Sequence, residues 1–465
     1  MPASSSAAEP AASRKLAIDA GEELNAICEE LGLDSGGRAR QPIVRRILEA
    51  GSGSTPDREY KARRKAPPSR LDDVALVGSA PMTGRQRCTN RRSTHRRLGL
   101  AATARDRQLA VVDFFCGAGG FTCGSLLAGA KMVCGIDCDG RARKTYQENN
   151  RNGEGPAPFI HARIEDLNPM HLGELLELYE QHPVLFVGCP PCQPFTNLRT
   201  SKERSASSRD SLRLFIDHVV ALAPDFVLVE NVPGIRAKKY GNLWDETVAR
   251  LRDAGYRLRS EIVNAARFGV PQKRLRILLV AARDAEPPWP QPTHEPNEYR
   301  TVRDAFTPPG LLCGPSLCQV EPGQRCEHDA QQSASLLSEL NLRRVRAIRR
   351  PGGSRTEWPS DLELACYRGH EGHTDVYGRM DWGRPSPTLT TRFVSLSNGR
   401  FGHPEENRAI TPREGALLQT FPPEYRFYDA SRDMNVIHIG NAVPPRLAQA
   451  FVAAIVESVR GIGDR

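Results

Sequence analysis

The chain has 465 residues with an apolar share of 39%, which is ample for at least one buried core and excludes a disordered or fibrous protein. Its 64 Lys and Arg exceed its 55 Asp and Glu, and the net charge of +9 favours a polyanionic partner such as nucleic acid over an acidic small molecule. Residues 1–10 lack the apolar core of a secretory signal and no apolar run is long enough to cross a bilayer, so we expect a cytoplasmic protein without membrane contact.

Residues 1–107 form an extension whose composition differs from that of the rest. Apolar residues recur at helical spacing in Leu24–Leu31 and again in Ile43–Leu48, so we expect two short helices. Between Arg58 and Arg107, runs of Arg and Lys alternate with Pro, Ser and Thr, which is typical of a flexible basic linker. The helix pair is either a small DNA-binding or regulatory module or an appendage of the main domain.

From Leu109 onward, short apolar runs alternate with helix-like stretches such as Leu212–Leu222. Five of these runs have the composition of buried parallel strands: Leu109–Val112, Met132–Ile136, Val184–Val187, Phe226–Val229 and Ile277–Ala281. The alternation predicts a doubly wound α/β domain with a mostly parallel sheet over residues 108–284. Pro-rich, irregular sequence then predicts an inserted second domain over 285–381, and the chain returns to the first domain over 382–465.

A glycine-rich turn, Asp113–Phe121, follows the first predicted strand and opens a helix. Glycines at such a turn let backbone N–H groups approach a ligand closely. The spacing is not the dinucleotide fingerprint, because Thr122 stands where its third glycine belongs. Asp137 ends the second strand, where a carboxylate can accept hydrogen bonds from a ribose. Together these features favour a nucleoside ligand, although a plain tight turn has the same local composition.

The predicted strand Val184–Val187 leads into Gly188–Thr196, which reads GCPPCQPFT. Two prolines fix the backbone just before Cys192, so its sulfur is expected at the carboxyl edge of the sheet, where open α/β sheets bind their ligands. Cys189 and Cys192 also form a C-x-x-C pair, which is found in redox and zinc sites. The intervening prolines and the lack of a second such pair disfavour both of these alternatives.

Three charged residues are expected at the same edge of the sheet. Glu230 ends the predicted strand at Phe226–Val229, and Arg274 and Arg276 begin the next one, where alternation places them on one face. Taken singly, the acid is as well explained by a structural salt bridge and the arginines by a solvated face. Together with Cys192 they predict a nucleophile, an acid and two cations that converge on the glycine-rich turn.

These segments and their order resemble the cytosine-5 DNA methyltransferases of bacterial type, over residues 109–283 and 381–457. Arg384–Thr390, a predicted helix at Arg413–Gln419, and Gly440–Pro444 also fit that family. The resemblance implies transfer of a methyl group from S-adenosylmethionine to C5 of a cytosine in a specific site of double-stranded DNA. Two alternatives are a tRNA cytosine-5 methyltransferase, whose distinctive short insertion we do not find, and a DNA-binding regulator that acts through residues 1–50.

The resemblance also implies a role for each group. Cytosine C5 is unreactive until a nucleophile adds at C6, and Cys192 as a thiolate is expected to supply that attack. Glu230 is expected to serve N3 of the base, Arg276 to hold O2, and Arg274 to orient the neighbouring loop.

The cofactor pocket is likewise implied by the family. Phe115 is expected to stack on the adenine and Asp137 to bind the ribose. The remaining expected pocket residues are Gly117, Ala118, Gly119, Gly120, Cys138, Pro190, Asn441 and Ala442. Arg163 stands where family members often carry an acid for the adenine amino group, so Glu165 or Asp166 is the expected substitute.

DNA binding requires the target base to flip out of the stack, and phosphate contacts must offset that cost. The segment that follows the nucleophile is expected to close over DNA as a basic flap, with contacts from Gln193, Thr196, Arg199 and Arg209. The inserted segment occupies the place of the family's target recognition domain, and its arginines at 343–350 either contact DNA or form a solvated helix face. We expect a monomer on DNA, with a cognate restriction endonuclease as a partner.

The 12 cysteines are scattered through apolar segments, which fits reduced thiols better than a disulfide framework. Two sets of residues invite a zinc interpretation: Cys313, Cys318, Cys326 and His328, and Cys366, His370 and His373. Neither set has a familiar ligand spacing, so we expect no metal.

Overall fold

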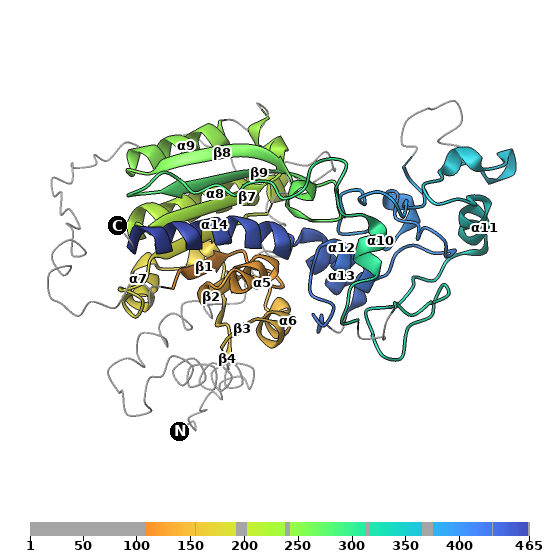
Figure 1. Ribbon diagram of the computed structural model, residues 1–465, viewed down its shortest axis with the longest axis horizontal. Coiled ribbons are helices and arrows are strands. Elements are labelled where there is room, and N and C mark those ends of the chain that lie inside the picture. The colour runs from red at the N-terminus through yellow and green to blue at the C-terminus, as the bar shows by residue number, and fades with distance from the viewer. Residues whose placement is uncertain are drawn as a thin grey trace, which may run out of the picture.

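The computed structural model describes residues 108–153, 155–191, 202–237, 242–311, 316–364, 375–429 and 431–463, so the extension 1–107 and its expected helices lie outside the described residues. The main feature is a seven-stranded sheet with the order β5-β2-β1-β6-β7-β9-β8 (Figure 1). Its strands are β1 (Ala110–Phe114), β2 (Lys131–Asp137), β5 (Phe159–His161), β6 (Val184–Gly188), β7 (Phe226–Asn231), β8 (Arg257–Asn264) and β9 (Leu275–Ala282). A small hairpin of β3 (Arg151–Asn152) and β4 (Gly155–Pro156) forms a separate sheet.

The first four expected strands are present and pair in parallel with one another. The fifth, expected at Ile277–Ala281, is buried within β9 but runs antiparallel to both β7 and β8, so its predicted direction was wrong. The cause is the short connection 265–274 between β8 and β9, because a parallel pair needs a crossover of a dozen or more residues. Strand β8 was not predicted, since it is an edge strand with mostly exposed or half-buried side chains.

Helices cover both faces of the sheet, which confirms the doubly wound α/β class (Figure 1). Alternation along β1 explains the two layers, since Val111 belongs to one buried cluster and Val112 to the other. One face carries α5 (Gly120–Leu127), α6 (Ala142–Asn149) and α14 (Pro445–Gly463). The other carries α7 (Pro169–Glu177), α8 (Lys202–Leu222) and α9 (Leu243–Asp253). The expected helix Leu212–Leu222 is the second half of α8.

A smaller part of the molecule extends from one end of the sheet (Figure 1). Its helices are α10 (Val302–Phe306), α11 (Glu339–Ala347), α12 (Pro412–Leu418) and α13 (Arg432–Asn441). Short 3-10 turns occur at Ile164–Asp166, Pro233–Arg236, Ala265–Phe268, Arg355–Glu357, Ser360–Leu362 and Leu396–Asn398. One buried cluster joins α10 to α12 and α13, and another surrounds Trp358 and Tyr377. The packing therefore crosses the expected limits at 285 and 381, and these limits stay a prediction.

Cys318 and Cys326 form a disulfide, which departs from the expectation of reduced cysteines. Gln332, outside the loop that the bridge closes, contacts both cysteines: its carbonyl accepts from the Cys326 N–H at 2.8 Å, and its Nε2 donates to the Cys318 carbonyl at 2.9 Å, an arrangement that the sequence does not reveal. The free cysteines of the described residues are Cys116, Cys123, Cys134, Cys138 and Cys189.

Cys313, Cys366, His370 and His373, which belonged to the zinc interpretation, lie outside the described residues. Within the described ranges, no three His, Cys, Asp or Glu side chains gather as metal ligands would.

No single helix of the described residues is long and apolar enough to span a membrane. Taken together, α13 and α14 pass that test by length and composition, with a bend of 40° between them.

Candidate active site

The glycine-rich turn after β1 has a strongly constrained backbone. Phe115, Gly117 and Gly119 have positive φ angles of 62°, 51° and 88°. A Cβ atom at Gly119 would lie 2.4 Å from Asn150 Nδ2, and one at Gly120 would lie 2.5 Å from the Val443 carbonyl oxygen. A Cβ at Gly117 would meet no atom of the described residues within 4 Å. Gly119 and Gly120 are therefore required by packing, whereas Gly117 borders open space where a ligand can approach the backbone.

Asp137 lies at the end of β2 and contacts this turn directly. Its Oδ2 accepts a hydrogen bond of 2.8 Å from the Gly117 N–H, and its Oδ1 accepts one of 2.8 Å from the Asp139 N–H. Burial raises the pKa of Asp137, and these two bonds act in the opposite direction. A carboxylate has about four acceptor positions, so the side chain keeps capacity for ribose hydroxyls.

The other expected pocket residues lie around the turn. Ala442 follows α13, and its Cβ would be 3.1 Å from a Cβ at Gly120. Cys138 is exposed beside Asp137, and its carbonyl lies 3.1 Å from His161 Nε2. Arg163 pairs with Glu165, one of the two acids expected to replace the usual adenine ligand. The turn, Asp137 and the chain after α13 thus meet at one end of β1 and β2.

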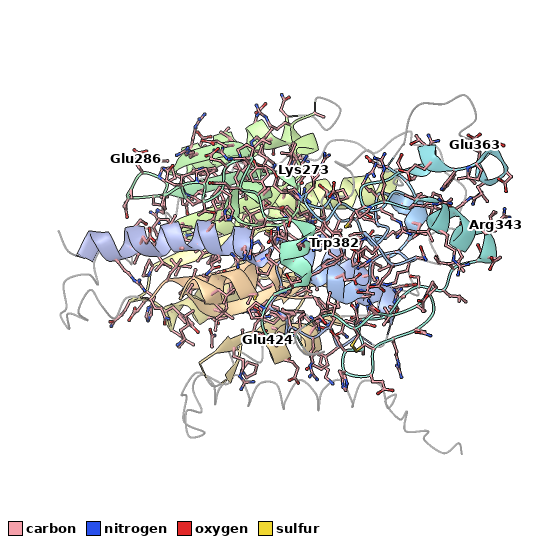
Figure 2. All side chains as sticks on the ribbon, turned by 45° about the vertical axis from the view of Figure 1, so that its right-hand side comes forward. Lys273, Glu286, Arg343, Glu363, Trp382 and Glu424 are labelled. Atoms are coloured by element: carbon pink, nitrogen blue, oxygen red, sulfur yellow. A yellow bond between two sulfur atoms is a disulfide. The ribbon has the colours of Figure 1, made fainter. Side chains whose placement is uncertain are left out.

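The acid and the cations come together at the neighbouring strand ends. Glu230 on β7 and Arg276 on β9 form an ion pair with Oε1 and Nε 2.8 Å apart, and both side chains are about one tenth exposed. Arg274 is buried just before β9, and its Nη2 donates a 3.1 Å hydrogen bond to the Ala442 carbonyl. Figure 2 shows the neighbouring Lys273 where the sheet meets the smaller part.

The segment that carries the expected nucleophile begins beside this pair. Strand β6 pairs in parallel with β7, so that Gly188 lies opposite Val229. Asn231 Nδ2 donates a 3.3 Å hydrogen bond to the Pro190 carbonyl, which joins the proline turn to the end of β7. Asn231 was not expected to take part in the site, because an asparagine after a strand is an ordinary turn residue.

Four expected site residues lie outside the described residues: Cys192, Gln193, Thr196 and Arg199. Arg209 lies on α8, and its side chain is not among those described. Burial, followed by the negative charge of Glu230, raises the pKa of the Cys189 thiol well above its usual range. Cys189 is therefore poorly suited to form the thiolate that nucleophilic attack requires.

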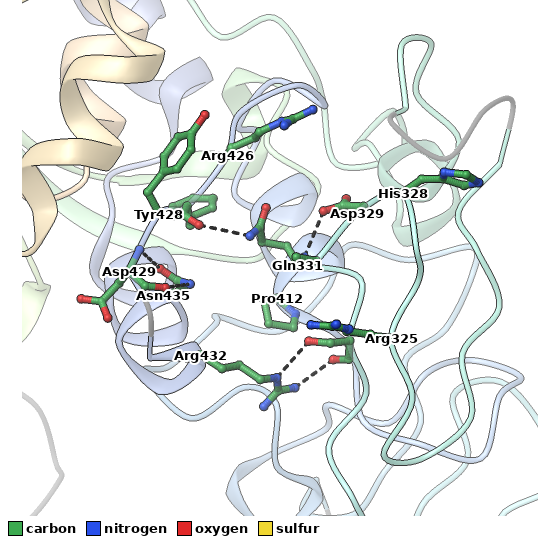
Figure 3. Close-up of a pocket in the computed structure, with 13 residues that line it drawn as sticks. Arg325, His328, Asp329, Gln331, Pro412, Arg426, Tyr428, Asp429, Arg432 and Asn435 are labelled. Atoms are coloured by element: carbon green, nitrogen blue, oxygen red, sulfur yellow. Dashed lines mark hydrogen bonds between the residues drawn. The ribbon is translucent and has the colours of Figure 1, made fainter.

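A cavity of about 530 Å³ lies between residues 325–333 and residues 426–435 (Figure 3). Its polar side chains hold these two segments together. Arg432 donates to the Ser333 hydroxyl and carbonyl at 3.1 and 2.9 Å, and Gln331 Nε2 donates to the Phe427 carbonyl at 3.1 Å (Figure 3). None of the described site residues lines this cavity, so we assign its side chains to the junction between segments and not to the chemistry.

Comparison with known proteins decides among the functions considered. The family model described as C-5 cytosine-specific DNA methylase matches residues 109–457, well over half of the chain. The chain belongs to this family. The family predicted from the motifs is confirmed, and the protein is a DNA cytosine-5 methyltransferase, so the tRNA-methylating and regulator alternatives are not favoured.

Curated relatives agree with this assignment. The methylase is 37% identical to the Type II methylase M.HgiDII of Herpetosiphon aurantiacus over 77% of its own length and 97% of that protein. It is 30% identical to the Type II methyltransferase M1.HphI of Haemophilus parahaemolyticus, over 75% of its own length and 87% of the relative. A crystal structure from E. coli, of a prophage-encoded protein described as a DNA modification methyltransferase, has a TM-score of 0.55 at 21% identity. It covers 75% of this chain and 99% of that one, and supports the fold alone.

Proposed function

We propose that this methylase transfers the methyl group of S-adenosylmethionine to C5 of a flipped cytosine in a specific duplex DNA site, through a covalent adduct at Cys192. The observation that carries the proposal is the Glu230–Arg276 pair, which lies at the strand ends beside the turn that leads to Pro191 and Cys192. A pyrimidine edge presents N3 and O2 side by side, and an acid next to a guanidinium matches that pair of atoms.

The described residues around the turn fit the cofactor. Gly117 borders open space, and the Asp137 carboxylate beside it retains acceptor positions for hydroxyl groups. Phe115, Ala118, Cys138, Pro190, Asn441 and Ala442 would complete the pocket. When bound, S-adenosylmethionine supplies an electrophilic methyl group on its sulfonium.

The chain's own groups would act on the base in sequence. The Cys192 sulfur forms a bond to C6, and the displaced electron pair moves towards N3 and O2, where Glu230 in its protonated form gives its proton to N3 and the Arg276 guanidinium donates to O2. C5 is then nucleophilic and accepts the methyl group. A base removes the C5 proton, N3 returns its proton to the Glu230 carboxylate, the C6–S bond breaks, and the electron pair of that bond returns to sulfur as thiolate. Arg274 would hold the loop at Ala442 in place through its 3.1 Å hydrogen bond.

The segment after Cys192, with Gln193, Thr196, Arg199 and Arg209, would contact the DNA as a closing flap, and residues 285–381 would read its sequence. Because the curated relatives are Type II enzymes, we also propose a restriction-modification role with a cognate endonuclease, and a monomer on DNA. Sequencing host DNA for 5-methylcytosine with and without the gene tests the genomic role and gives the recognised site.

The mechanism is tested with duplex DNA that carries 5-fluorocytosine at the target position. Its C5 substituent cannot leave as a proton, so the wild-type protein should form a stable covalent complex in the presence of S-adenosylmethionine. Cys192→Ser should form none while still binding the cofactor, and Cys189→Ser serves as the matched control that retains trapping. Trapping by Cys192→Ser would overturn the assignment of the nucleophile.

A further inference from the structure

Two glutamines, Gln272 and Gln419, are fully buried. They lie between the proposed cofactor pocket and the segment that carries Arg274 and Arg276. Gln272 lies just before β9, and Gln419 directly follows α12. A buried amide is costly unless its donors and acceptor are hydrogen-bonded, so the partners of these two side chains show what their burial achieves.

Gln419 holds the backbone at the end of α13. Its Nε2 donates to the carbonyls of Ile439 and Ala442 at 2.7 and 3.3 Å. The Ala442 carbonyl also accepts the 3.1 Å hydrogen bond from Arg274. Ala442 and the next residue pack against Gly120 of the glycine-rich turn, so the carbonyl that these two side chains share fixes the chain behind that turn.

Gln272 joins Gln419 to the arginine segment. Its Nε2 donates to Gln419 Oε1 at 3.1 Å and to the Leu418 carbonyl at 3.4 Å. Its Oε1 accepts from Arg274 Nη1 at 3.4 Å and from the backbone N–H of Leu389 at 3.1 Å. One side chain thus contacts α12, the start of β9 and the segment 384–390.

We infer that Gln272 and Gln419 are positioning residues that hold the cofactor pocket and the segment Arg274–Arg276, whose Arg276 binds the base, in one fixed arrangement. The inference rests on the proposed function, because it needs Asn441 and Ala442 to border the cofactor and Arg276 to hold the base. An apolar side chain of the same length at position 419 would remove one donor each from the Ile439 and Ala442 carbonyls and would leave the buried Gln272 amide without its acceptor at Gln419, so the chain after α13 would be held less firmly.

The test compares Gln419→Met and Gln272→Met with Gln449→Met. Gln449 on α14 also donates from its amide to a carbonyl, that of Leu127 at 3.3 Å, but this exposed contact joins two helices outside the site. Calorimetric titration of the full chain with S-adenosylmethionine in the absence of DNA gives the Kd of the cofactor. Steady-state kinetics of methyl transfer to duplex DNA gives the KM of S-adenosylmethionine and the kcat. Thermal unfolding shows that each variant is folded.

Gln419→Met should raise the cofactor Kd and KM on the order of tenfold with a smaller change in kcat, since it releases the Ala442 backbone. Gln272→Met should lower kcat as well, because it also releases Arg274. Gln449→Met should match the wild type in all three quantities. If Gln419→Met does not fold, Gln272→Glu decides, since it keeps the acceptor for Arg274 and Leu389 and removes the donor to Gln419 and to the Leu418 carbonyl; it should raise the cofactor Kd.

Wild-type values of Kd, KM and kcat in both folded glutamine variants would overturn the inference. A wild-type protein that fails to bind S-adenosylmethionine would instead refute the proposed function. The two failures are distinguishable. Failure of the inference requires an active wild-type enzyme, whereas failure of the proposed function excludes one.

Discussion

Glu230 and Arg276 are 2.8 Å apart on the neighbouring antiparallel strands β7 and β9, and both are nearly withdrawn from solvent. A buried ion pair adds little net stability, because the cost of removing both charges from water offsets their attraction. Its location at the strand ends beside the proline turn is therefore better explained by chemistry than by folding. In the proposed mechanism, the pair meets the N3 and O2 atoms of the flipped cytosine.

Glu230→Gln should slow methyl transfer at least about a hundredfold, because the amide keeps the shape but cannot donate a proton to N3. Single-turnover transfer to a target duplex measures this rate. Glu261→Gln is a suitable control, since Glu261 pairs with Arg259 on the exposed strand β8 and should leave the rate unchanged. An unchanged rate in Glu230→Gln would remove this residue from the mechanism.

Gly117 and Gly120 should respond differently to alanine. Gly120→Ala would force a methyl group to within 2.5 Å of the Val443 carbonyl, so it should lower the free energy of unfolding by several kcal/mol, about as much as other overpacked sites. The added methyl group of Gly117→Ala would meet no atom of the described residues within 4 Å, but the backbone retains a φ of +51°. This variant should lose only about 1–2 kcal/mol of the free energy of unfolding while its cofactor binding weakens. Urea unfolding and cofactor titration separate the two effects. Equal losses of stability in Gly117→Ala and Gly120→Ala would contradict the presence of open space at Gly117.

Asp113 should make stability depend on pH near neutrality. Burial raises its pKa from 3.8 to about 7, even though Thr122 donates a 2.7 Å hydrogen bond to it. Between these two values the folded state holds the proton more tightly than the unfolded state does, so stability is greatest at the acidic end and falls as the pH rises through about 7. The full shift corresponds to at most about 4 kcal/mol.

Asp113→Asn removes the titrating group and should flatten this dependence. Urea unfolding of both proteins at about pH 5 and about pH 8 measures the difference, and other groups cancel in the comparison. A wild-type protein whose stability rises over that interval relative to Asp113→Asn would contradict the raised pKa.

The parallel strands could be predicted because each is a continuous apolar run buried on both faces, as Val184–Gly188 shows. The direction of β9 could not be predicted, because an apolar run is compatible with a parallel or an antiparallel strand. The short connection from β8 makes it antiparallel. β8 itself escaped prediction because charged residues such as Arg257 and Glu261 occupy its exposed edge.

For the site, the convergence of Glu230 and Arg276 followed from their positions at strand ends, which topology brings to one edge of a sheet. The contact between Gln272 and Gln419 did not follow, since it joins residues 147 positions apart through side chains that sequence alone would place at the surface. The disulfide between Cys318 and Cys326 likewise could not be predicted, because it depends on the conformation of the loop between them.

A buried ion pair anchors α12. Arg408 and Glu414 are essentially unexposed and make two hydrogen bonds of 2.8 and 2.7 Å. Burial alone would raise the pKa of Glu414, but Arg408 lowers it to about 2. The contribution of this carboxylate to the free energy of unfolding is therefore fully present at pH values above its ordinary pKa of 4.5, and it is lost as the pH falls through about 2.

Glu414→Gln should destabilise the protein by about 3 kcal/mol at neutral pH, because it removes the buried carboxylate and leaves the buried Arg408 guanidinium paired with the more exposed Glu406, whose Oε2 lies 2.9 Å from Arg408 Nε. Asp361→Asn is the matched control, since it breaks the pair of Arg343 and Asp361 whose side chains are 54% and 59% exposed, and it should cost less than about 1 kcal/mol. Urea unfolding at neutral pH and at about pH 3 compares the two. The difference between Glu414→Gln and wild type should shrink at the lower pH, and a constant difference would show that Arg408 does not hold Glu414 in its charged form.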